Sequence, residues 1–119
     1  MEKFNFEELK VYQKSLILID RIYAETKEFP KEEVYGLTSQ FRRAAISIAL
    51  NIAEGSGSSN PEFRRYLQIY LNSVKECVVC VEIAQRQKYL QLEESNHYRK
   101  DLAELSKMIT SLMKYLTRK

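Results

Sequence analysis

Two cysteines in the middle of the sequence have a spacing that can do chemistry. Cys77 and Cys80 form a CxxC pair, which in redox proteins lies at a helix N-terminus, where the thiol pKa is lowered. Here the pair lies inside a long, regular apolar repeat, which predicts the interior of a helix. A zinc site would need further ligands, and the sequence contains one histidine, His97. We therefore expect two buried, unreactive thiols and no metal site.

Glu94 and His97 have the Glu-x-x-His spacing of di-iron helical bundles. Such a site needs two of these motifs and two further glutamates, and one histidine cannot supply two motifs. The same shortage argues against a Ser-His-Asp triad built in the usual way, unless His97 meets a serine in space. We expect a protein that is not an enzyme and that uses neither a cofactor nor a small-molecule substrate.

The segment NIAEGSGSSNPEFRRY, residues 51–66, holds two of the three glycines in the chain. A phosphate-binding P-loop needs a preceding strand and a terminal Lys-Ser or Lys-Thr pair, and this segment has neither. A connection between two helices explains it better, with Gly55 ending one helix in the left-handed conformation and Asn60 capping the next. Arg64 and Arg65, in the opening turns of that next helix, could still hold an anion.

Apolar periodicity predicts four helices, on which or between which the candidate residues above lie. Glycine and proline are scarce, at three and two residues, which favours an all-α fold because strand-rich folds need many turns. We expect the first helix to follow an Asn5 cap and end before Pro30, the second to span residues 32–54, the third to follow Asn60 and the fourth to begin near His97. The apolar stripes expected to form the core are, in chain order, Leu9, Tyr12, Leu16, Ile19 and Tyr23; Val34, Leu37, Phe41, Ala44, Ile48 and Ile52; Phe63, Leu67, Tyr70, Val74, Cys77, Val81 and Ala84; and Tyr98, Leu102, Leu105, Ile109, Leu112 and Leu116.

The last two stripes repeat every 3.5 residues, a spacing typical of helices that pack nearly parallel or antiparallel. The connections are short, so consecutive helices should be antiparallel. We predict an up-down-up-down antiparallel four-helix bundle that forms a single domain over residues 1–119. The apolar run at residues 16–19 is too short for a signal peptide or a membrane span, so we expect a cytoplasmic protein with no membrane partner.

Polar residues form matching stripes on the second and third helices. The first stripe is Gln40, Arg43, Ser47, Asn51 and Glu54, and the second is Arg64, Gln68, Asn72 and Lys75. In an antiparallel hairpin, Asn51 and Glu54 come level with Arg64 or Arg65. We interpret one set of residues as a structural motif that sets the register of the two helices: Arg43, Ser47, Asn51, Glu54 and Gly55. The alternative is a polar surface for RNA or a protein partner, although interspersed acids would dilute its charge.

A second apolar row on the first helix lies off the predicted core stripe: Val11, Leu18 and Ile22. The third and fourth helices carry further apolar residues of this kind, namely Tyr66, Ile69, Ile83, Met108 and Tyr115. Apolar surface beyond one core stripe is typical of an interface, so these rows predict a homo-oligomer.

The basic residues are concentrated in the second half of the chain. The formal net charge is +3, and residues 60–119 carry 11 basic and 7 acidic side chains. We predict that RNA, if it is the partner, contacts five cations: Arg42, Arg64, Arg65, Lys75 and Arg86. The alternative is an interaction scaffold whose partner is a protein and not a nucleic acid.

Two segments resemble a known family. The segments YGLTSQFRRAAISIALNIAEGSG and EFRRYLQIYLNSVKE are similar to those of the four-helix-bundle proteins encoded in 23S ribosomal RNA intervening sequences. Members are similar in fold to the accessory variability determinant of diversity-generating retroelements. The resemblance implies a homo-oligomeric ring, commonly a pentamer, with no known enzymatic activity. It also implies association with RNA, a ribonucleoprotein or a nucleic-acid-processing protein.

Overall fold

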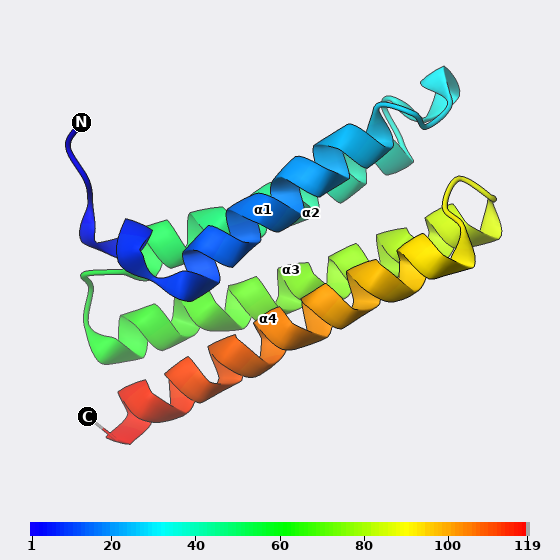
Figure 1. The fold of residues 1–119 in the computed structure, drawn as a ribbon. Helices are drawn as coiled ribbons and strands as arrows, with labels where there is room; N and C mark the ends of the chain where they lie inside the picture. The colour runs from blue at the N-terminus through cyan, green and yellow to red at the C-terminus, as the bar shows by residue number, and fades with distance from the viewer. Residues whose placement is uncertain (119) are drawn as a thin grey trace.

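Four α-helices run alternately up and down along one axis in the computed structural model, which describes residues 1–118 (Figure 1). The helices are α1 (Lys10–Thr26), α2 (Leu37–Gly55), α3 (Asn60–Arg86) and α4 (Leu92–Arg118), with short 3-10 turns η1 (Asn5–Glu8) and η2 (Lys31–Glu33). Both chain ends lie at the same end of the bundle as the α2–α3 connection. The described residues form no strand, and the predicted all-α up-down-up-down bundle is confirmed.

The first helix begins later than the Asn5 cap predicts. Phe4 caps η1, and its backbone N–H donates to Glu7 Oε2 at 2.8 Å. Leu9 then adopts an extended conformation, with φ −71° and ψ 127°, so the chain cannot continue as one helix and α1 starts at Lys10.

The buried face of α1 is also not the predicted one. Val11, Leu18 and Ile22 are 6%, 3% and 0% exposed, so they belong to the core of a single chain. The prediction that these three residues form an oligomer interface is therefore wrong, because side chains without exposed surface cannot contact a second chain. The row expected in the core lies on the flank instead, and its Leu16 is 40% exposed.

A buried serine explains why the sequence pattern predicts the wrong buried face for α1. Ser15 lies in the same row as Val11 and Leu18, and it is fully buried. Its hydroxyl donates to Val11 O at 2.6 Å and lies 3.0 Å from the hydroxyl of Tyr70 on α3. A polar residue in the middle of the row hides its core character, because periodicity arguments assume that buried positions are apolar.

The second helix begins at Leu37 and not near residue 32. Glu33 Oε1 accepts a hydrogen bond from the backbone N–H of Leu37 at 3.2 Å, which satisfies one free donor at the start of α2. Gly36 lies outside the helical conformation, with φ −116° and ψ −112°. Val34 therefore precedes α2 and is exposed, whereas the rest of its predicted stripe, from Leu37 to Ile52, is buried.

The stripes of α3 and α4 are confirmed with two small exceptions. Phe63 and Leu112 are half-buried, and every other residue of the two predicted stripes is buried. The cap of α3 is Ser59 rather than Asn60, since Ser59 Oγ accepts from the backbone N–H of Glu62 at 3.3 Å. A strict 3.5-residue repeat, from Phe63 to Ala84 on α3 and from Tyr98 to Leu116 on α4, leaves only one face of each helix that can meet the other helices.

Gly55 is the last residue of α2 and is not left-handed, so its predicted conformation is wrong. The left-handed residue of this connection is Gly57, with φ 85°. Gly55 is needed for a different reason: a Cβ atom there would lie 2.8 Å from both Phe63 Cδ1 and Tyr66 Cβ on α3. Glycine thus lets the ends of α2 and α3 approach closely.

Candidate functional site

Part of the predicted polar stripe forms a buried link between α2 and α3. Asn51 is buried, and its Nδ2 donates to Ser47 O at 2.7 Å and to Ser47 Oγ at 3.0 Å. The hydroxyl of Ser73 on α3 donates to Ser47 Oγ at 2.8 Å. Small polar groups that satisfy one another can be buried between closely packed helices. Ser73 was not among the predicted residues, although it lies one position before Val74 of the core stripe.

The charged members of the stripe do not join this link. Arg43 and Glu54 are exposed, and within residues 1–118 neither makes an ion pair. Arg64 Nη1 instead donates to Thr117 Oγ1 on α4 at 3.2 Å, and Arg65 pairs with Glu62 on its own helix at 2.7 Å. The predicted ionic network across the α2–α3 hairpin is therefore absent from the described chain, because Arg43 and Glu54 point to solvent.

Arg42, predicted to contact RNA, is occupied within the bundle. Its Nε donates to Thr26 Oγ1 at 2.8 Å, its Nη2 donates to Tyr23 O at 3.3 Å, and its guanidinium lies 4.4 Å from the centre of the Tyr23 ring. Both acceptors belong to the last turn of α1: one is the hydroxyl of Thr26, and the other, Tyr23 O, also accepts from the backbone N–H of Lys27. A cation at this end is stabilised by the negative end of the helix dipole. Arg42 thus caps the C-terminus of α1 from α2.

The other predicted cations differ in their freedom to meet a phosphate. Arg65 and Arg86 are exposed but paired with Glu62 and Glu82 on the same helix. The guanidinium of Arg65 also lies 4.6 Å from the centre of the Tyr66 ring. Lys75 is exposed and makes no ion pair among the described residues.

A more regular set of free cations lies on α4 and was missed from the sequence. We define the α4 basic row as Lys100, Lys107, Lys114 and Arg118, all of which are exposed. None of the four forms an ion pair within the part of the chain that the structure describes. Residues 105–118 contain no acid at all. The spacing of seven, seven and four residues keeps the row on one helix face, opposite the buried stripe.

The acids nearest to the row are held by α1. Lys14 Nζ lies 2.5 Å from Glu104 Oε1, and Arg21 pairs with Asp101. Lys14 and, more weakly, Lys100 lower the pKa of the Glu104 carboxyl. Asp101 and Glu104 thus pair with α1 cations, and the rest of the α4 basic row, from Lys107 to Arg118, lies on a stretch of helix that carries no acid.

The two cysteines are free and buried, as expected. Burial raises the pKa of Cys77 well above its ordinary value and raises that of Cys80 to about 11. Thiols with such values stay protonated at neutral pH and are poor nucleophiles and metal ligands. Residues 1–118 bring together no group of three or more potential His, Cys, Asp or Glu ligands for a metal ion.

The remaining ionisable groups considered from the sequence make contacts within the bundle. Tyr98 donates to Arg21 O at 3.2 Å and to Glu25 Oε1 at 3.3 Å, and burial raises the pKa values of both Tyr98 and Glu25. His97 is exposed, and its Nε2 lies 3.8 Å from Asp101 Oδ2 on the same helix. It contacts no serine hydroxyl among the described residues.

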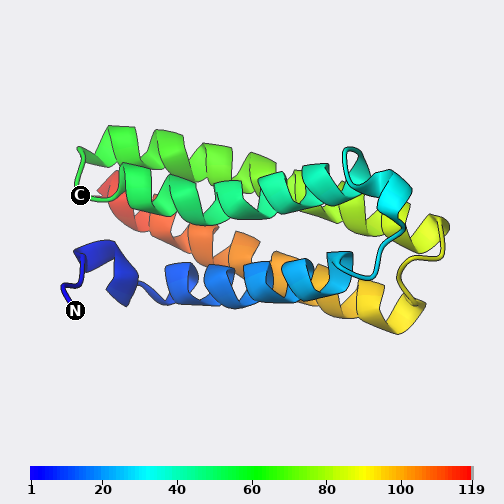
Figure 2. The same cartoon turned by 90° about the horizontal axis from the view of Figure 1, so that it is seen from above.

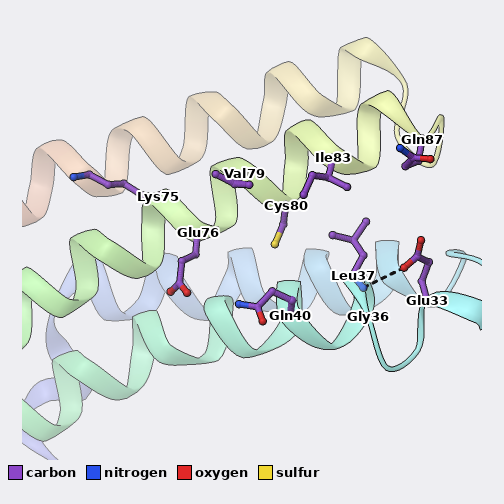
Figure 3. A pocket seen from close by; sticks show the side chains of 10 residues that line it. All are labelled: Glu33, Gly36, Leu37, Gln40, Lys75, Glu76, Val79, Cys80, Ile83 and Gln87. Carbon is purple, nitrogen blue, oxygen red and sulfur yellow. Dashed lines mark hydrogen bonds between the residues drawn. The ribbon is translucent and has the colours of Figure 1, made fainter.

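An apolar groove lies between the first half of α2 and the second half of α3 (Figure 3). This α2/α3 groove has a volume of about 660 Å³, and its lining includes Leu37, Cys80, Val79 and Ile83. Val79 and Ile83, one turn apart in the second half of α3, are 56% and 41% exposed. The carboxylates of Glu33 and Glu76 line the groove beside them.

Comparison with known proteins places the chain in a family. A family model described as 23S rRNA-intervening sequence protein matches residues 7–111. The chain belongs to this family. A crystal structure of a protein of unknown function from the S23 ribosomal protein family of Bacteroides thetaiotaomicron VPI-5482 superposes with a TM-score of 0.80. The two sequences are 27% identical, and the match covers 87% of this chain and 98% of the other.

No curated protein matches the sequence. In the described part of this 23S rRNA-intervening sequence family member, none of the helices is both long enough and apolar enough to traverse a bilayer.

Proposed function

We propose that this protein is a non-enzymatic, cytoplasmic homo-oligomer, a pentamer by analogy with its family, that binds RNA or a ribonucleoprotein through the α4 basic row. The observation that carries the proposal is the presence of four exposed cations on one helix face with no ion-pair partner in the described chain. The family description refers to an rRNA intervening sequence, in which such proteins are encoded, so the choice of RNA as the polyanion is itself part of the proposal.

The geometry of the row suits a phosphate backbone. A spacing of seven residues along a helix corresponds to about 10.5 Å, at 1.5 Å per residue. Each lysine or arginine that contacts a phosphate releases condensed counterions, which supplies affinity without sequence preference. An oligomer would repeat the row on every chain, and several weak sites on one assembly bind a single polyanion much more tightly than one site does.

The test is RNA binding over a range of salt concentrations. A variant with glutamine at Lys100, Lys107, Lys114 and Arg118 should bind more weakly, and the slope of log K against log salt should fall by about 0.9 for every cation that contacts a duplex phosphate. The matched control carries glutamine at four exposed lysines outside the row, Lys3, Lys27, Lys31 and Lys88, and has the same net charge.

Two results would contradict the proposal. If the wild type binds neither single-stranded nor structured RNA at about 50 mM salt, where electrostatic binding is strong, the RNA hypothesis fails. If the control variant loses as much affinity as the row variant, binding depends on net charge and not on the α4 basic row.

A second candidate function is a protein-interaction scaffold. The α2/α3 groove supports it, because exposed apolar residues such as Val79 and Ile83 are typical of protein contacts. Recovery of the tagged protein from its host, with sequencing of bound RNA and identification of bound proteins, separates the two candidates.

A further inference from the structure

We infer that the RNA on the α4 basic row is single-stranded and places an unpaired base in a second groove, which lies between α3 and α4. This rests on the RNA binding of the proposed function, and it adds the form of the RNA and the position of one base. Three features support it: the unequal flanks of the α4 basic row, the cations across from it on α3, and the apolar lining between the two helices.

The two flanks of the α4 basic row differ in charge. Figure 2 shows α1 and α4 along one side of the bundle and α2 and α3 along the other, and Figure 1 shows α4 beside α3. The flank that faces α1 carries Asp101 and Glu104, which pair with α1 cations. The flank that faces α3 has no acid between residues 99 and 117 and consists of Arg99, Ala103, Ser106, Thr110, Met113 and Thr117. A polyanion that lies along the row therefore extends towards α3 and not towards α1.

Further cations lie on the side of α3 that borders this flank. Lys75 is exposed and makes no ion pair within residues 1–118. Arg64, on the same side, donates from Nη1 to a threonine hydroxyl of α4 at 3.2 Å. The acid on this border, Glu82, is shared between Arg99 of α4 at 2.6 Å and Arg86 at 2.8 Å. Cations thus lie on both sides of the line along which α3 and α4 meet.

A groove with a mainly apolar lining lies between these cations. This α3/α4 groove has a volume of about 400 Å³. Val79 of α3 and Ala103 of α4 are exposed on its two walls, and Leu102 is buried between them. Figure 3 shows the Cys80 side chain directed towards α2, with Lys75 and Val79 on the opposite side of α3. The basic surface of α3 and α4 therefore contains an apolar hollow at its centre.

An apolar hollow in a basic surface suits an unpaired nucleotide better than a duplex. A duplex keeps its bases stacked inside and presents sugars and phosphates to the protein, so the hollow would stay empty. A single strand can turn a base out of its stack, and burying the faces of that base against aliphatic side chains is favourable. Lys100 and Lys107 lie one turn before and one turn after Ala103, and Lys75 lies across the groove, so phosphates next to the buried base have cations on both sides.

The first test compares three RNA probes on the wild-type protein by fluorescence anisotropy at one salt concentration. An unstructured oligouridylate of about ten nucleotides should bind more tightly than a strand of the same length in which abasic residues replace the uridines. The abasic strand keeps every phosphate, so its loss measures the base alone. The expected loss is about tenfold, the effect of burying roughly 60 Å² of apolar surface. A blunt-ended duplex of the same length should also bind more weakly than oligouridylate, although it carries twice the charge.

Two matched variants locate the base. Val79→Asn makes one wall of the α3/α4 groove polar without changing any charge. It should weaken oligouridylate binding by about threefold to tenfold and leave the slope of log K against log salt unchanged, because the phosphate contacts remain. Val79 also borders the α2/α3 groove, so the control is Ile83→Asn, on the same helix at a residue that lines the α2/α3 groove, and this variant should bind like the wild type. Both side chains are exposed, so both variants should keep the helical circular dichroism of the wild type.

The behaviour of the abasic strand separates this inference from the proposed function. An abasic strand that binds as tightly as oligouridylate, or a duplex that binds more tightly, would overturn the inference while leaving RNA binding by the α4 basic row standing. Equal losses in Val79→Asn and Ile83→Asn would overturn the placement of the base between α3 and α4. A wild type that binds none of the three probes at about 50 mM salt would overturn both proposals.

Discussion

Gly55 offers a direct test of how α2 and α3 are held together. A Cβ atom at this position would lie 2.8 Å from Tyr66 Cβ, an atom that cannot move without the backbone of α3. Gly55→Ala should therefore force the helix ends apart, and overpacking of this kind costs about 1–3 kcal/mol. Alanine gains roughly 0.5–1 kcal/mol over glycine in the middle of a helix, but Gly55 is the last residue of α2, so little of that gain is returned here. The expected net loss in the free energy of unfolding lies in the lower part of the overpacking range, at about 1–2 kcal/mol.

The assay is thermal unfolding followed by circular dichroism at one fixed protein concentration, because oligomer stability depends on concentration. A loss of this size corresponds to a fall in Tm of roughly 4–8 °C for a domain of this length. Gly55→Val should lower the Tm further, because its larger side chain meets the same two neighbours.

Asparagine at two positions provides the control. Gly57 has φ 85°, and a side chain there would meet no atom within 4 Å, so Gly57→Asn should be close to the wild type because asparagine tolerates the left-handed conformation. Gly55→Asn should be destabilised like Gly55→Ala. If Gly55→Ala is as stable as the wild type, the close-approach explanation is refuted, and so is a left-handed Gly55, because alanine is strained in that conformation. If Gly55→Ala is destabilised but Gly55→Asn is tolerated, a left-handed Gly55 is restored instead.

Four further predictions follow from burial and hydrogen bonding. Ile22→Ala should lower the free energy of unfolding by about 2–5 kcal/mol in urea titrations, because Ile22 is fully buried; a loss below 1 kcal/mol would contradict its place in the core. Arg42→Gln should lower the stability by about 1–3 kcal/mol through the lost α1 cap while leaving the salt dependence of RNA affinity unchanged. Glu54→Ala should change the stability by no more than about 0.5 kcal/mol, since Glu54 is exposed and unpaired in the described chain, and a larger loss in the same titration would show an unrecognised contact. Cys80, whose pKa is raised to about 11, should react with a thiol reagent at pH 8 only at the rate at which the bundle opens, and a rate equal to that of the unfolded protein would show an accessible thiolate.

The two helices predicted most completely are α3 and α4, and the reason lies in their sequence pattern. Their apolar residues follow an unbroken 3.5-residue repeat, and no competing apolar row of similar length exists on either helix. The local sequence pattern was therefore sufficient to identify the buried face of each of these two helices. The bundle architecture follows from the same pattern together with the short connections, and the family motif around residues 35–57 supported it.

The α1 helix shows where periodicity stops being sufficient. It carries two apolar rows that both repeat at helical spacing, and the row that contains the polar Ser15 is the buried one. The partner for that serine, Tyr70, is 55 residues away in sequence. Only the packing of α1 against α2 and α4, with Tyr70 of α3 reaching Ser15 across the core, decides which row is buried. The predicted interface residues Val11, Leu18 and Ile22 were assigned to the wrong surface for this reason.

Which basic residues are free to bind a ligand also depends on the tertiary structure. The sequence identified Arg42, Arg65 and Arg86 as cations, but their hydrogen bonds and ion pairs arise from side chains that meet across or along helices. The α4 basic row is a heptad-spaced pattern in the sequence, but only the structure shows that the nearby acids Asp101 and Glu104 pair with α1. A sequence determines how many charges a helix carries, and the tertiary structure determines which of them are already neutralised, because long side chains pair with whatever neighbouring helix the fold places within reach.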